Sequence, residues 1–100
     1  MNKHLLNKQE RVLRAFSDSN VLFVNAGFLV EQRTVFGLSG EDSDLAVSIE
    51  WSDAAGCKWA ADFTEENLLT ASFAHNQITL NDSEGESVYL ECHDLKPGKV

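Results

Sequence analysis

Four side chains of this chain could bind a metal or take part in nucleophilic catalysis: the two cysteines, Cys57 and Cys92, and two of the three histidines, His75 and His93. Zinc sites usually consist of two pairs of ligands, with the members of each pair two to four residues apart. Only the adjacent Cys92-His93 comes near that pattern. Adjacent residues of a strand point to opposite faces, so these two are poorly placed to share an ion. A Cys57 nucleophile would need contact with His75 or His93. We expect no metal, no cofactor and no catalytic residue, and we interpret both thiols as structural.

Carboxylates alternate along two loops, in a way that superficially resembles a calcium loop. Neither loop supplies the full ligand series of an EF-hand, and no helices flank them. Glu50 and Asp62 would lie on a solvated sheet face, where nothing separates their pKa values for acid–base work. The loop acids suit contacts with a basic protein and also discourage edge-to-edge association. We predict partner-binding residues in the two loops: Glu41, Asp42, Asp44, Asp82, Glu84 and Glu86.

Trp51 and Trp59 flank one turn and can lie side by side across a hairpin. Such a cross-strand aromatic pair most simply stabilises a sheet. An aromatic cluster beside acids would also suit a cationic or amphipathic ligand. The second hypothesis is therefore a small-molecule-binding domain, with an apolar pocket between helix and sheet. Its predicted lining is Phe23, Phe28, Trp51, Trp59 and Phe63.

The elements that must position these residues begin with a helix. Apolar residues between Lys3 and Phe16 gather on one stripe, with Asn2 as a possible N-cap, so we predict a helix over 3–16. Such a short helix needs a surface to pack on. The run Val21–Val30 follows and is apolar on both faces. It can form one bulged strand or two strands that turn at Asn25-Ala26-Gly27.

The clearest strand pattern lies in the second half of the chain. Apolar residues alternate with polar ones over 47–52 and 57–63, and the residues between them fit a turn. Thr64 can cap a short helical turn, after which 68–73 is predicted as a strand with Leu69, Ala71 and Phe73 inward. Two further strands contain Ile78 with Leu80 and Val88 with Cys92, and the tail 94–100 is expected to fray.

One helix followed by short strands with tight connections implies antiparallel pairing, because parallel strands need longer crossovers. We therefore predict an α+β fold in a single domain over residues 1–100. The N-terminal helix packs on a strongly curved antiparallel meander sheet of about six strands, within residues 20–93, which could form a partial barrel. The helix would cover one face of Val21–Val30, and something else must cover Val21, Phe23 and Leu29.

The 100 residues carry a formal charge of −8, and the charge is unevenly distributed. Residues 1–35 hold five basic and three acidic side chains, whereas residues 36–100 hold three basic and thirteen acidic ones. An acidic surface repels nucleic acid and anionic lipid, so neither is an expected partner. No segment resembles a signal peptide or a membrane span, and two cysteines cannot form a disulfide framework, so we expect a cytoplasmic protein.

The leading hypothesis is a small acidic binding protein, without enzymatic activity, that engages a basic protein partner as an inhibitor, an immunity-type protein or an accessory factor. The small-molecule-binding domain is the alternative, and an enzyme is the third and weakest, because no nucleophile, base and orienting group are recognisable. A homodimer is also plausible, since the basic N-terminal third could meet the acidic remainder of a second copy.

Overall fold

Helix α1 spans Lys8–Asp18 in the computed structural model, which describes residues 7–25 and 27–93. Asn7 caps it: Asn7 Oδ1 accepts the Glu10 N–H at 2.8 Å, and the Asn7 N–H donates to Glu10 Oε1 at 3.1 Å. This reciprocal pair sets the start of α1 at Lys8, and residues 3–6 of the predicted helix lie outside the described residues. Asn2, the cap predicted from sequence, and the tail 94–100 lie outside the described residues.

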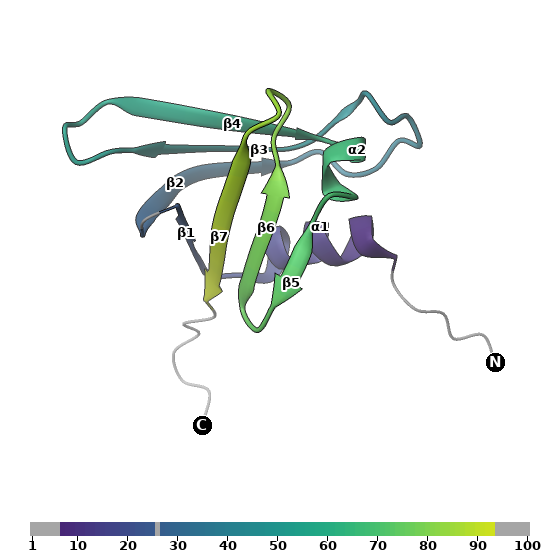
Figure 1. Cartoon of the computed structure of the whole chain (residues 1–100), viewed down its shortest axis with the longest axis horizontal. Helices are drawn as coiled ribbons and strands as arrows, with labels where there is room; N and C mark the ends of the chain where they lie inside the picture. Colours follow the sequence, from purple (N-terminus) through teal and green to yellow (C-terminus); the bar gives the residue numbers. More distant parts are fainter. Residues whose placement is uncertain (1–6, 26, 94–100) are drawn as a thin grey trace.

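Seven antiparallel strands form one curled sheet, a half-barrel that wraps around α1 (Figure 1). The α+β fold class with a strongly curved antiparallel sheet is confirmed, with seven strands where about six were predicted. The order is β4-β3-β2-β1-β7-β6-β5, so the first strand pairs with the last and joins two smaller meanders. The bounds are β1 Val21–Val24, β2 Phe28–Val35, β3 Leu45–Ser52, β4 Lys58–Thr64, β5 Ser72–Ala74, β6 Gln77–Asn81 and β7 Ser87–His93.

The apolar run Val21–Val30 forms two strands rather than one bulged strand. Asn25 and Gly27 both adopt positive φ, 54° and 96°, and the Gly27 N–H donates to the Val24 carbonyl at 3.2 Å. Glycine and asparagine tolerate this left-handed backbone better than other residues. The turn lets β1 pair with β2 on one side and with β7 on the other.

The predicted strand over 68–73 is wrong for most of its length. Helix α2 occupies Glu65–Leu68, and Thr64 caps it together with Asn67 as expected. Leu68 and Ala71 are buried, whereas Leu69 is 50% exposed, because the helical turn rotates it to the outside. Only β5 remains as strand at the end of this segment.

The core lies between α1 and the sheet face that curls around it. Val12 and Phe16 of the helix are fully buried there, and the Phe16 and Phe63 rings are 5.9 Å apart. Alternation along β3 and β4 places Val47, Ile49 and Trp51 on this face. No helix in the described part of the chain is long and apolar enough to cross a bilayer.

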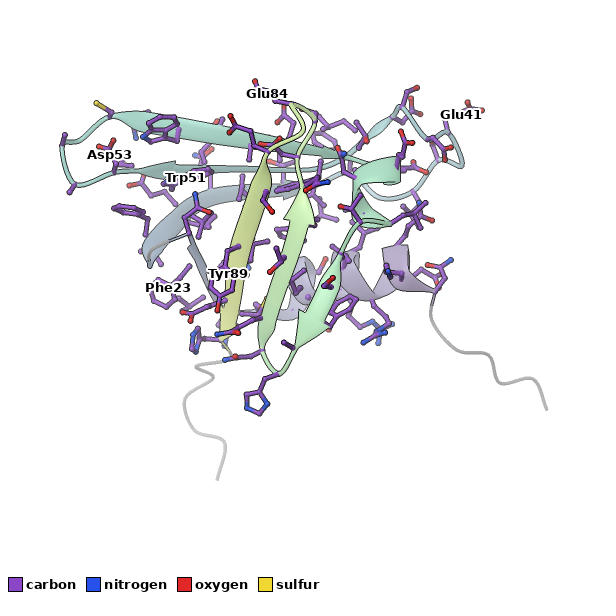
Figure 2. The ribbon with its side chains drawn as sticks, viewed as in Figure 1. Phe23, Glu41, Trp51, Asp53, Glu84 and Tyr89 are labelled. Carbon is purple, nitrogen blue, oxygen red and sulfur yellow. The ribbon has the colours of Figure 1, made fainter. Side chains whose placement is uncertain are left out.

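The outer face of β1 and β2 remains partly open. Phe23 is paired with Leu29 across these strands, and Leu29 is 53% exposed. The Phe23 ring meets the His93 ring edge to face at 5.4 Å, and Phe23 and Tyr89 lie in the same region of the sheet (Figure 2). The outer apolar face predicted from the sequence therefore exists, and neighbouring side chains of the sheet cover part of it.

Candidate functional site

The two tryptophans stand opposite each other near the free end of the β3–β4 hairpin, which projects beyond the rest of the sheet (Figure 1). Trp51 is only 6% exposed, but Trp59 is 53% exposed. The alternating pattern predicted an inward position for both, and it holds for Trp51. Ala61 and Phe63 of the same strand are buried, so Trp59 is open because it lies toward the projecting end of the hairpin rather than because β4 is an edge strand.

Asp53 holds the indole of Trp59 in place. Its Oδ2 accepts the Trp59 Nε1–H at 2.9 Å, and its Oδ1 accepts the N–H groups of Ala55 and Cys57, each at 2.9 Å. These bonds, that of Trp59 first and that of Cys57 next, hold the pKa of Asp53 below its ordinary value, because each stabilises the ionised carboxylate. A carboxylate is therefore fixed at the turn, and the indole that it holds is about half exposed.

Asp82 brings a second set of acids to the same place. Its Oδ1 accepts the N–H groups of Glu84 and Glu86 at 2.9 Å each, and the Ser83 N–H donates to the Asp62 carbonyl of β4 at 2.8 Å. The first two bonds shape the β6–β7 loop, and the third ties it to the hairpin. Asp82 is only 8% exposed, and among the described residues nothing donates to its Oδ2.

A groove of about 360 Å³ opens between the hairpin and this loop. Phe28, Trp51, Trp59 and Val88 supply apolar surface, and Asp53, Asp82, Glu84 and Glu86 supply carboxylates. None of the described residues that line it is basic. We call it the Trp–acid groove, and its lining residues are Asn25, Phe28, Trp51, Asp53, Trp59, Ala60, Asp82, Glu84, Glu86, Ser87 and Val88.

The groove combines parts of the two predicted sites and leaves out the rest. Of the predicted ligand residues, Phe28, Trp51 and Trp59 line it. Phe63 is fully buried in the core against Phe16, and Phe23 lies on the outer face. The space between helix and sheet, where the pocket was predicted, is therefore filled at Phe63 by core side chains.

The two predicted acidic loops lie apart, and only one of them reaches the groove (Figure 2). In the other loop, main-chain carbonyls of Asp42 and Asp44 accept the N–H groups of Glu66 and Glu65 at 3.0 and 2.9 Å. The Asp44 carboxylate accepts the Ser39 hydroxyl at 2.6 Å. Part of this loop is thus occupied in holding the N-terminus of α2.

Glu65, which the sequence reading did not single out, anchors that same loop. Its carboxylate accepts the Ser39 N–H, the Ser39 hydroxyl at 2.9 Å and the Gly40 N–H at 3.1 Å. The Ser39 N–H contributes most to lowering the pKa of Glu65, and burial opposes this. The sequence analysis also treated Asp53 only as part of a turn. A carboxylate six positions before Trp59, across a tight turn, was the signal that could have predicted their hydrogen bond.

The thiols and imidazoles remain dispersed. Cys57 is exposed at the hairpin turn, and Cys92 is half-buried, where burial raises the pKa of its thiol despite a hydrogen bond with Ser19. Asp62 accepts the Ser48 hydroxyl at 2.7 Å on the exposed side of the sheet. Within residues 7–25 and 27–93, no three His, Cys, Asp or Glu side chains are grouped to hold a metal ion.

Comparisons of the chain with protein-family models, with curated proteins and with solved structures find no match. The site must therefore be interpreted from its own geometry.

Proposed function

We propose that this protein is a small binding protein whose Trp–acid groove receives a lysine or arginine side chain of a basic protein partner. One observation carries the proposal: the exposed indole of Trp59, which Asp53 holds in place, lines the same groove as the acids of the β6–β7 loop. An indole face attracts a cation, and nearby carboxylates can accept hydrogen bonds from the N–H groups of that cation. The protein would act by occupying a basic surface of the partner, as an inhibitor, immunity-type protein or accessory factor does.

Charge and burial in the groove support a cationic ligand over a neutral one. The hydrogen bond from Trp59 and those from the turn N–H groups hold the pKa of Asp53 below its ordinary value, and Glu84 and Glu86 are exposed. Asp82 is nearly buried and keeps one oxygen without a donor among the described residues. A carboxylate oxygen that has no donor within the protein can accept a hydrogen bond from a charged N–H group of a ligand.

The test uses a heptapeptide of alternating arginine and valine, blocked at both ends, as the probe. Its binding is followed by calorimetry and by tryptophan fluorescence. We expect the double variant E84Q/E86Q to bind the probe about tenfold more weakly, because two rim carboxylates are lost. We expect W59A to weaken binding as well, by removing the indole face.

The matched control is E41Q/D42N, which removes the same formal charge from the acidic loop that lies away from the groove. This control should bind the probe within about twofold of the unmodified protein, since only distant, screened charges change. An equal loss in both double variants would mean that net charge alone attracts the probe, and the groove proposal would then be wrong.

A small organic cation is the second candidate ligand, because about 360 Å³ lies within the size range of small-molecule sites. Arginine amide alone would then bind as tightly as the heptapeptide. If the peptide binds more tightly, as we expect, the main chain around the cation contributes to recognition.

We further propose that the protein works in a reducing compartment such as the cytoplasm. Cys57 and Cys92 are both free, and Cys57 is exposed. An exposed free thiol is uncommon in an oxidising environment, where it would form mixed disulfides.

A further inference from the structure

The outer edge of β4 offers main-chain groups next to the Trp–acid groove. The Asp53 N–H donates to the Cys57 carbonyl at 2.9 Å, which marks these two residues as a hydrogen-bonded pair of the hairpin. Hydrogen-bonded and non-bonded pairs alternate along an antiparallel ladder. Trp59, Ala61 and Phe63 therefore bond to β3, whereas the N–H and C=O groups of Lys58, Ala60 and Asp62 point away from it.

One of these outward residues is already engaged. The Asp62 carbonyl accepts the Ser83 N–H of the β6–β7 loop at 2.8 Å, which confirms the direction assigned by alternation. No main-chain group among the described residues pairs with the outward groups of Lys58 or Ala60. The open part of the edge is thus short, and it lies beside the groove that Trp59 and Ala60 line.

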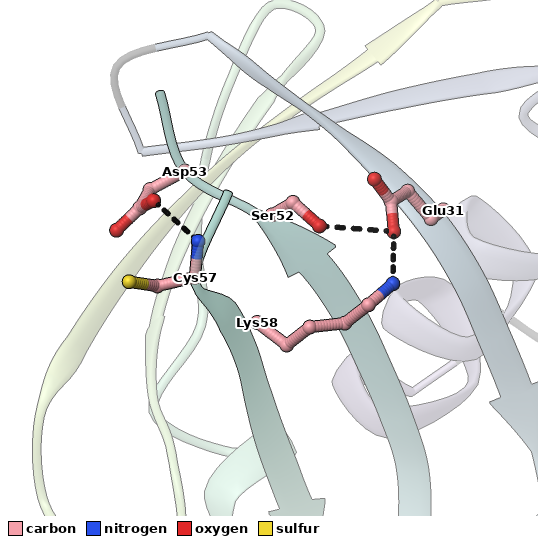
Figure 3. A network of polar contacts seen from close by, with 5 residues as sticks. All are labelled: Glu31, Ser52, Asp53, Cys57 and Lys58. Atoms are coloured by element: carbon pink, nitrogen blue, oxygen red, sulfur yellow. Dashed lines mark hydrogen bonds and ion pairs between the residues drawn. The ribbon is translucent and has the colours of Figure 1, made fainter. Parts of the chain in front are cut away.

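The open part of the edge carries one charged side chain, that of Lys58, and one small side chain, that of Ala60. Natural edges often carry a lysine that repels an incoming strand. The Lys58 side chain is 74% exposed, and its Nζ pairs with Glu31 Oε1 at 3.3 Å, where the Ser52 hydroxyl also donates, so part of its charge is offset (Figure 3). Ala60 has too small a side chain to block an approach.

The opposite edge of the sheet is a less suitable site. Strand β5 has only three residues, and the guanidinium of Arg11 lies over the Phe73 ring at 4.1 Å. A positive charge there disfavours a basic segment. The groove beside β4 has the opposite character, because Asp53, Asp82, Glu84 and Glu86 line it and none of its described lining residues is basic.

We infer that the partner presents a basic segment in extended conformation, which adds a short strand to β4 at Lys58–Ala60 and places a cationic side chain over Trp59 in the groove. This inference rests on the proposed function and specifies its mode. Strand addition supplies affinity through main-chain hydrogen bonds, and the alternate side chains supply specificity. The charge of the groove selects the basic segment.

The first test compares the arginine–valine heptapeptide with a version N-methylated at every internal residue, which has the same charge but no internal N–H donors. We expect the methylated peptide to bind at least about tenfold more weakly, since main-chain bonds are lost. We also expect amide hydrogen exchange at Lys58 and Ala60, measured by NMR, to slow in the complex with the unmethylated peptide.

The second test changes the edge itself. In A60P the lost N–H is one that points away from β3, so the β3–β4 ladder keeps its bonds. A60T retains the N–H and serves as the matched control. We expect A60P to bind the unmethylated peptide at least about tenfold more weakly than A60T does, because both variants enlarge the side chain and only A60P loses the N–H.

The outcomes separate the mode from the function. If both peptides bind equally and the Lys58 and Ala60 amides exchange as in the free protein, strand addition is wrong while side-chain capture in the groove stands. If neither peptide binds, the proposed function itself is wrong. The peptide comparison uses the unmodified protein, so it decides the question even if A60P fails to fold.

Discussion

At the scale of single residues, the aromatic side chains divide between stability and binding. Phe63 is fully buried against Phe16, whereas Trp59 is half exposed and lines the groove. We expect F63A to lower the free energy of unfolding by about 3 to 5 kcal/mol, because it leaves a cavity in the core. We expect W59A to cost no more than about 1 kcal/mol and to weaken binding of the arginine–valine peptide. Urea unfolding and calorimetry measure the two effects, and a reversed order would contradict the assignment of Phe63 to the core.

Glu65 makes stability depend on pH. Its pKa is lowered in the folded protein by the N–H groups of Ser39 and Gly40 and the Ser39 hydroxyl, from an ordinary value of 4.5. The unfolded chain therefore takes up a proton at Glu65 before the folded chain does. This stabilisation is complete above pH 4.5 and is lost as the pH falls through the folded pKa.

We accordingly expect E65Q to be less stable than the unmodified protein at neutral pH, with the difference shrinking as the pH falls below 4.5. The measurement is the urea midpoint of both proteins across the acidic range. E66Q is the control, because its carboxylate makes none of the contacts of Glu65 with the loop. A constant difference between E65Q and the unmodified protein would show that ionisation of Glu65 contributes nothing.

At the scale of elements, the alternation of apolar and polar residues predicted the β3–β4 hairpin correctly. The prediction failed after Thr64, where the apolar residues fit both a strand and a helix. Strict alternation over 47–63 identified β3 and β4, and the Asn25–Gly27 segment signalled that a turn was possible. The stretch after Thr64 was harder, because Leu68, Leu69, Ala71 and Phe73 satisfy both a strand and a helical turn. The capping box of Thr64 and Asn67 decides for the helix.

The groove lay beyond prediction for a different physical reason. It joins residues 51–60 to residues 82–88, and a main-chain bond from Ser83 to Asp62 holds the two segments together. Neither residue type at these two positions signals a main-chain contact. The sequence therefore indicates that the two tryptophans lie near acids of the β3–β4 hairpin. It does not indicate that the acids of the β6–β7 loop lie beside them.

The cap of α2 yields a prediction at this scale. The Thr64 hydroxyl bonds with Asn67, accepting its N–H at 3.2 Å, and Leu68 at the end of the helix is fully buried. We expect T64A to lower the free energy of unfolding by about 1 kcal/mol, since a helix N–H loses its acceptor. T64S retains the hydroxyl and should stay close to the unmodified protein. Thermal unfolding compares the three proteins, and equal stability of T64A and T64S would contradict a capping role.

At the scale of the whole molecule, two basic side chains of the N-terminal third make contacts within the chain. Lys8 Nζ donates to the Leu69 carbonyl at 3.3 Å, and the guanidinium of Arg11 lies over Phe73. Nη1 of Arg33 is buried. Lys8, Arg11 and Arg14 nevertheless remain exposed, so the argument against a charge-driven dimer depends on the net charge of the whole protein.

The net charge of the protein opposes the association of two copies. Two copies that each carry −8 repel each other, and dissolved salt screens that repulsion. We expect any self-association to use apolar surface, such as the outer face with the exposed Leu29. The contribution of apolar surface to association does not weaken as the salt concentration rises. We therefore expect the mass measured by light scattering to stay constant or to increase from low to high salt. A dimer at low salt that dissociates at high salt would show instead that the charge asymmetry between the two parts of the chain drives assembly.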